Sequence, residues 1–129
     1  MRRNSTSRPS DRTGADGGRN WAERLARCQL EAVGMTFLAA NHTERRGELD
    51  LVMQDGELVV FVEVRHRASA EYGSASESID ARKLERMRRT ARLYLLRHYR
   101  TEEVPCRFDA VLLSGNARAY TLRHLRGLF

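Results

Sequence analysis

The sequence has few of the residues that mark a membrane protein, an oxidising compartment or a structural metal site. Its 129 residues include only two cysteines and two prolines. Cys28 and Cys106 form no CxxC pair, so we interpret them as small apolar residues of a reducing compartment. No apolar run is long enough to span a membrane, and the basic N-terminus lacks the apolar segment of a signal peptide. We therefore expect a cytoplasmic protein with no membrane partner.

Two common kinds of site are also missing from the sequence. The chain has no Gly-rich phosphate loop, which argues against nucleotide hydrolysis. Its four histidines are dispersed and lack zinc-binding spacing; they are His42, His66, His98 and His124. The chemistry must therefore come from other polar side chains, above all from the acidic ones.

Lysine is almost absent, although the chain is basic. Of 23 basic residues only Lys83 is a lysine, and the formal net charge is +6. This charge is compatible with a nucleic-acid partner and, equally, with a basic surface that is merely solvated. Residues 1–18 offer almost nothing to bury, so we expect a disordered basic tail there. Residues 19–129 are expected to form a single domain.

The hydrophobic pattern predicts helices and strands in a mixed order. A first helix is expected from Asn20, a good N-cap, to Gly34, with Val33 on its buried face. A second, strongly basic helix is expected over residues 77–99. Strands are predicted at residues 35–41, 48–54, 57–65, 106–113 and 119–122. This order predicts an α/β (α+β) domain with a mixed sheet flanked by helices.

Acidic residues interrupt an apolar hairpin at residues 47–65. The Asp55-Gly56 pair predicts a tight turn, which would place Asp50 opposite Phe61. Side chains alternate along strands, so the hairpin would gather four polar residues on one face: Glu48, Asp50, Glu63 and Arg65. His66, the next residue, should face the opposite side. Carboxylates set so close together in an apolar hairpin need a cation nearby.

Two sources of positive charge are compatible with this hairpin. A hard divalent cation such as Mg²⁺ would accept the carboxylate oxygens as ligands, although Glu48 lies near a strand end and could point to water. An ion-pair network could instead neutralise the acids, through Arg45, Arg46, Arg65 and Arg67. The residues alone leave both alternatives open. If a metal binds, phosphodiester hydrolysis is the chemistry that follows.

The acidic hairpin resembles the pattern of the PD-(D/E)XK nucleases. In that superfamily an Asp and a Glu bind Mg²⁺ and a Lys two residues later aids catalysis, and here Asp50 precedes Glu63-Val64-Arg65. A wider set of segments resembles the bacterial YraN-like family, whose endonuclease-like fold is similar to that of Holliday-junction resolvases. These segments are Trp21–Ala26, Gly47–Val52, Val60–Arg65, Tyr72-Gly73, Lys83 and Arg107–Asp109.

The resemblance implies both a fold and an activity. The fold would be a restriction-endonuclease-like three-layer domain. The activity would be Mg²⁺- or Mn²⁺-dependent hydrolysis of DNA, with branched or single-stranded DNA as the expected substrate. Glu23 would join Asp50 and Glu63 around the metal, whereas helical periodicity alone favours a solvated Glu23 that complements the helix dipole. By analogy with two-fold junction resolvases, a homodimer is expected.

One residue departs from the superfamily pattern. Arg65 stands where that pattern has lysine, and a guanidinium can stabilise developing charge but is a poor general base. Lys83, on the second predicted helix, could reach the site. The arginines expected to bind nucleic acid are Arg45, Arg46, Arg67, Arg86 and Arg89. Asp109 is expected to pair with an arginine such as Arg107. The alternative function is a catalytically inactive nuclease-fold protein that binds DNA, RNA or another protein.

Overall fold

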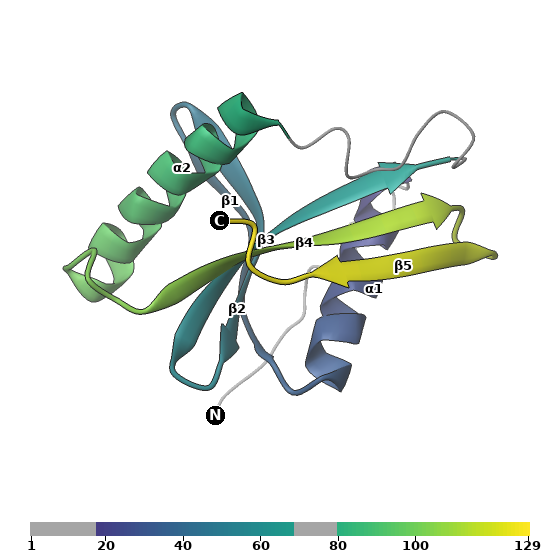
Figure 1. Ribbon diagram of the computed structural model, residues 1–129, viewed down its shortest axis with the longest axis horizontal. Coiled ribbons are helices and arrows are strands. Elements are labelled where there is room, and N and C mark those ends of the chain that lie inside the picture. The colour runs from purple at the N-terminus through teal and green to yellow at the C-terminus, as the bar shows by residue number, and fades with distance from the viewer. Residues whose placement is uncertain (1–17, 69–79) are drawn as a thin grey trace.

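A five-stranded sheet with one helix on each face makes up the described part of the chain (Figure 1). The structure is a computed structural model and describes residues 18–68 and 80–129. The elements are α1 (Gly18–Ala32), β1 (Thr36–Glu44), β2 (Gly47–Asp55), β3 (Leu58–Arg67), α2 (Ala81–Tyr99), β4 (Cys106–Gly115) and β5 (Tyr120–Leu125). The strands follow one another in sequence order across the sheet, and only β3 and β4 are parallel. The predicted mixed sheet and α/β class are confirmed.

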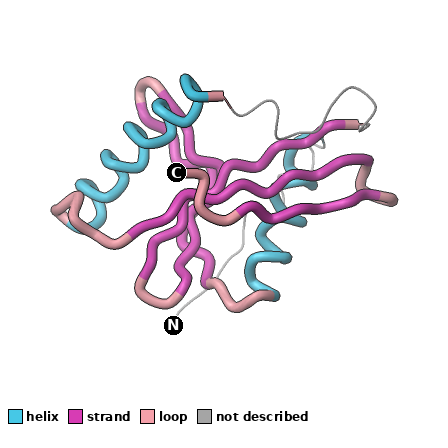
Figure 2. The backbone as a smooth tube through the Cα atoms, viewed as in Figure 1, coloured by secondary structure: helices cyan, strands magenta, loops and turns pink. Residues whose placement is uncertain are grey.

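The two helices cover opposite faces of the sheet. Along β3 the side chains alternate, so that Val60 and Val62 pack in one core cluster and Val59 and Phe61 in another. The first cluster contains Ala22, Ala26 and Leu30 of α1, and the second contains Met87, Ala91, Tyr94 and Leu95 of α2. The helix–sheet–helix order is the predicted three-layer arrangement (Figure 2). Neither described helix combines the length and apolar character needed to cross a membrane.

The first helix differs from the prediction at both ends. It begins at Gly18, so Asn20 lies inside it, and it ends at Ala32. Gly34 follows with a positive φ of 104°, a conformation that glycine adopts at low cost. Val33 lies beyond the last helical turn and is 45% exposed, so its predicted place on the buried face is wrong. The expected tail, residues 1–18, lies outside the described residues except for Gly18.

The second helix begins later than predicted, at Ala81. Asp80 has an extended backbone and caps the helix, because its Oδ1 accepts from the Lys83 backbone N–H at 2.9 Å. Residues 77–79, where the prediction placed the start, lie outside the described residues, as does the Tyr72-Gly73 pair. The last strand also differs from the prediction, since β5 spans Tyr120–Leu125.

The β2–β3 hairpin has a different register from the predicted one. Asp55 pairs with Leu58, so the two-residue turn is Gly56-Glu57, with a φ of 64° at Gly56. Phe61 consequently pairs with Val52 and not with Asp50. The shift amounts to two residues, and since side chains alternate with a period of two, each side chain stays on its predicted face.

The two strands of this hairpin separate before either of them ends. Their pairing stops at Leu51 opposite Val62. Residues 47–49 of β2 continue alongside β1, whereas residues 63–67 of β3 continue alongside β4 (Figure 1). We call this opening between β2 and β3 the strand fork. It lies between α1 on one face of the sheet and α2 on the other.

Candidate functional site

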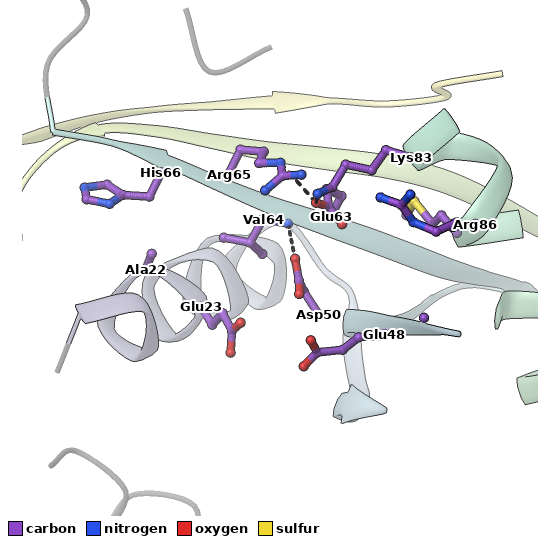
Figure 3. A pocket seen from close by; sticks show the side chains of 12 residues that line it. Ala22, Glu23, Glu48, Asp50, Glu63, Val64, Arg65, His66, Lys83 and Arg86 are labelled. Atoms are coloured by element: carbon purple, nitrogen blue, oxygen red, sulfur yellow. Dashed lines mark hydrogen bonds and ion pairs between the residues drawn. The ribbon is translucent and has the colours of Figure 1, made fainter. Parts of the chain in front are cut away.

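A cleft of about 510 Å³ opens at the strand fork (Figure 3). Side chains from both helices and from β2 and β3 line it, which explains why residues far apart in sequence meet there. The predicted site residues among them are Glu23, Glu48, Asp50, Glu63, Arg65, Lys83 and Arg86. The cleft therefore combines four carboxylates with three basic side chains.

Asp50 holds the fork open. Its Oδ2 accepts a hydrogen bond from the Val64 backbone N–H at 2.8 Å. In a continued antiparallel ladder that N–H would bond to a carbonyl of β2. The carboxylate therefore replaces the next backbone pairing and lies between the two strands.

Glu63 is a buried carboxylate, 8% exposed, and its pKa is raised to about 7. Burial is the largest cause, followed by the negative charge of Asp50. The nearby guanidinium of Arg65 acts in the opposite direction but does not compensate. A buried carboxyl group beside a second negative charge needs a proton or another cation nearby.

Two basic side chains lie against Glu63 without neutralising it fully. Arg65 Nε is 3.1 Å from Glu63 Oε2, and Lys83 Nζ is 3.9 Å from the same oxygen. The Arg65 Nε is buried yet has no hydrogen-bond acceptor in the described part of the chain. The guanidinium therefore lies close to the carboxylate but is not aligned with it as in a saturated pair.

Glu23 reaches the fork from α1 and is 8% exposed. The solvated position that helical periodicity favoured is wrong. Asn41 of β1 connects it to Glu48: in the amide orientation that matches donors to acceptors, the Asn41 nitrogen lies 3.2 Å from Glu23 Oε1 and 3.3 Å from Glu48 Oε2. Glu48 itself is exposed at the cleft.

Asn41 was not among the predicted site residues. It has a positive φ of 54°, which asparagine tolerates better than most residues. An asparagine directly after an apolar run was the available signal, but nothing in the sequence indicated which acids it would meet.

Gly47 was missed as well, except as part of a matching segment. A Cβ atom at this position would collide with Thr90 Oγ1 of α2. Thr90 is itself buried, and its hydroxyl donates to the Arg86 carbonyl at 2.9 Å. The missing side chain lets α2 approach β2 closely, which brings Lys83 and Arg86 over the fork.

The predicted nucleic-acid-binding arginines separate into two groups. Arg86 lines the cleft. Arg45 and Arg46 are exposed and form the turn between β1 and β2, and Arg67 is half-buried at the end of β3. Arg89 is exposed on α2 and lines a different depression, next to Glu85 and Glu102. The cleft thus brings together one of these five arginines.

The donor chemistry of the fork fits a divalent cation that needs few protein ligands. In residues 18–68 and 80–129 no group of three or more His, Cys, Asp and Glu side chains forms a ready set of metal ligands. Mg²⁺, however, is commonly held by one or two carboxylates, with water and substrate phosphate completing the shell. Asp50 and Glu63 provide such a pair.

Asp109 lies outside this cleft and is fully buried. Burial alone would raise its pKa, but hydrogen bonds from Arg107, His124 and the Gly127 N–H outweigh that effect and lower it. Arg107 Nε is 2.9 Å from Asp109 Oδ1, and its NH2 group also pairs with Asp55 at 3.1 Å. The expected pairing of Asp109 with Arg107 is confirmed, and the pair is structural.

Known proteins resemble this chain over most of its length. Residues 22–113 match the uncharacterised protein family UPF0102. A UPF0102 protein of Klebsiella pneumoniae is 50% identical over 95 residues, which cover 73% of this chain and 74% of that protein. The UPF0102 protein YraN of Escherichia coli is 47% identical over 109 residues, covering 84% and 82% respectively. All seven predicted residues of the cleft lie within the family match.

Proposed function

The chain belongs to the uncharacterised protein family UPF0102, and from this premise and the cleft we propose that it is a metal-dependent endonuclease of the PD-(D/E)XK type. Its substrate would be DNA, in branched or single-stranded form. One observation carries the proposal: the Asp50 and Glu63 carboxyl groups line one cleft at the strand fork, beside Arg65 and Lys83. This pair needs a cation, and the surrounding basic groups favour an anionic substrate.

Asp50 and Glu63 would hold Mg²⁺ or Mn²⁺, with Glu23 close by at the same cleft. A bound divalent ion would polarise a phosphoryl oxygen and lower the pKa of water. Arg65 and Lys83 would bind the phosphate and stabilise its charge, and Arg86 would hold the adjoining backbone. Arg45, Arg46, Arg67 and Arg89 would add phosphate contacts farther from the cleft.

A second candidate function is binding of DNA or RNA without cleavage. Arg65 favours it, because a guanidinium stays protonated and cannot serve as a base. In that case Arg65 would only bind phosphate, and the carboxylates would orient it. A homodimer stays a prediction for both functions, and sedimentation velocity with and without DNA would check it.

The experiment that separates these functions uses flap, junction and single-stranded DNA in Mg²⁺, Mn²⁺ or EDTA. The nuclease proposal expects cleavage by the wild type only with metal, and none by Asp50→Asn, which should still bind DNA. Glu57→Gln, a change of an exposed acid in the hairpin turn, is the matched control and should cleave normally. Binding without cleavage under every condition would favour the second function.

A further inference from the structure

An aromatic patch borders the cleft on the α1 side of the sheet; it consists of Trp21, His66 and Tyr120. The Trp21 ring centroid lies 4.8 Å from that of His66 in an edge-to-face contact. It lies 6.3 Å from that of Tyr120. Tyr120 is 41% exposed, His66 is exposed and Trp21 is half-buried. Three rings on three elements thus form one partly accessible surface.

The patch is held rigidly by the backbone around it. His66 Nε2 lies 2.7 Å from the Gly115 carbonyl oxygen, which only accepts, so this nitrogen must carry the proton. Gly115 pairs with Tyr120 across β4 and β5. Its φ of 113° and the close Ala119 carbonyl exclude a side chain there. The His66 ring and the backbone position of Tyr120 are therefore set before any ligand binds.

His66 connects the patch to the candidate site. It lines the same cleft as Asp50 and Glu63 (Figure 3). Its neighbour Arg65 projects from the other face of β3, toward Glu63. Arg118, in the turn that leads to Tyr120, is exposed. A strand whose phosphates lie at the cleft would consequently bring one of its bases to the aromatic rings that border it.

We propose that the aromatic patch binds an unstacked base of a single-stranded segment of nucleic acid whose phosphates lie at the cleft. The proposal rests on the nucleic-acid function proposed above and specifies the substrate: a strand whose bases are free to leave the duplex. Every base has a π-face, so stacking on such rings requires no particular sequence. A continuous duplex keeps its bases stacked inside and cannot use the patch.

The single tryptophan makes the patch directly observable. In EDTA, without cleavage, a single-stranded oligothymidine is expected to quench Trp21 fluorescence. An abasic oligonucleotide of equal length and charge should bind more weakly and leave the fluorescence unchanged. A blunt duplex should behave like the abasic strand. Equal quenching by base-bearing and abasic strands, or no quenching at all, would overturn the proposal.

Substitution of Tyr120 tests the same surface without touching the cleft. Tyr120→Leu should weaken binding of oligothymidine by roughly tenfold, since stacking on one aromatic ring is worth about that much. Tyr120→Phe keeps the ring and should bind like the wild type. Tyr99→Leu is the matched control, because Tyr99 is 39% exposed on α2, away from the cleft. If Tyr99→Leu and Tyr120→Leu lose the same affinity, the patch has no special role.

These outcomes are independent of whether the protein cleaves. If the wild type cleaves no DNA with metal but oligothymidine still quenches Trp21 fluorescence, the nuclease proposal is rejected and the proposal for the aromatic patch stands. If the wild type cleaves DNA with metal but bases do not quench Trp21 fluorescence, the nuclease proposal stands and the proposal for the aromatic patch is rejected.

Discussion

Two buried carboxylates on adjacent strands have opposite electrostatic environments. Asp109 of β4 accepts hydrogen bonds from Arg107, His124 and the Gly127 N–H, and its pKa is lowered. Glu63 of β3 has two basic neighbours, but its pKa is raised to about 7. In the parallel register Asp109 lies opposite Val62, the residue before Glu63, so side-chain alternation directs the two acids to opposite faces of the sheet.

This difference shows that partners, more than burial, distinguish a structural acid from a candidate functional one. The Asp109 carboxylate is charged and saturated, so it contributes to the fold and has no capacity for a ligand. Glu63 is buried beside the negative charge of Asp50, an arrangement that costs stability unless a cation joins it. Carboxylates kept in such an unfavourable state are candidates for function.

The largest expected loss of stability follows from replacing Asp109, the acid whose hydrogen bonds are saturated. Asp109→Ala leaves Arg107 and His124 facing a cavity without their negative partner. Breaking a buried charge pair typically costs about 3–5 kcal/mol of unfolding free energy. Urea unfolding at pH 7 measures this loss, with Glu57→Ala as an exposed control. A loss below about 1 kcal/mol would contradict a structural role for Asp109.

The next effect concerns the helix that brings Lys83 to Glu63. Gly47→Ala inserts a methyl group against Thr90 Oγ1 and should cost about 1–3 kcal/mol, as overpacking does. The double variant with Thr90→Ala removes the collision and should recover most of that loss. Thermal or urea unfolding of the single and double variants tests the contact. Additive losses would mean that Gly47 matters for another reason.

Removing the charge of Glu63 should change stability by a smaller amount and in the opposite direction, as a gain. Glu63→Gln keeps the shape and removes the repulsion with Asp50. In EDTA at pH 8 we expect the variant to be more stable than the wild type by about 1 kcal/mol. Urea unfolding compared with Asp109→Ala provides the contrast. If both variants are strongly destabilised, the distinction between the two acids fails.

The smallest expected effect concerns Glu44, a third acid with ordinary partners. Hydrogen bonds from Arg97 and His42 lower its pKa to about 2 from the usual 4.5. A lowered folded-state pKa adds stability that is complete above the unfolded value of 4.5 and is lost as the pH falls toward 2. The stability difference between wild type and Glu44→Gln should therefore shrink as the pH falls through that range. Thermal melts of both proteins along a pH series measure this difference. A stability difference that does not change with pH would contradict the prediction.

Much of the site could be predicted because a strand has a period of two. The register of the β2–β3 hairpin was wrong by two residues, yet Asp50 and Glu63 stayed on their predicted face. The pairing of Asp109 with Arg107 could also be predicted, since these residues lie two apart on one strand. Local periodicity was sufficient in both cases.

The remaining features depend on contacts between distant segments. Glu23 was at the edge of a helical face, and only the position of the fork buries it. The need for glycine at position 47 arises from Thr90 on α2, and the role of Asn41 arises from two acids on other elements. No window of sequence contains such pairs, so pattern alone could not reveal them.

The hydrogen bond from the Val64 N–H to Asp50 also makes one amide a reporter of the site. Its exchange with deuterated solvent depends on where a single carboxylate is, whereas the neighbouring amides of the sheet depend on backbone pairing. If a metal ion or a phosphate draws Asp50 away, the Val64 amide should exchange faster while the rest of β3 keeps its protection. In ¹⁵N-labelled protein, one resolved NMR cross-peak would therefore follow the engagement of the cleft without any turnover.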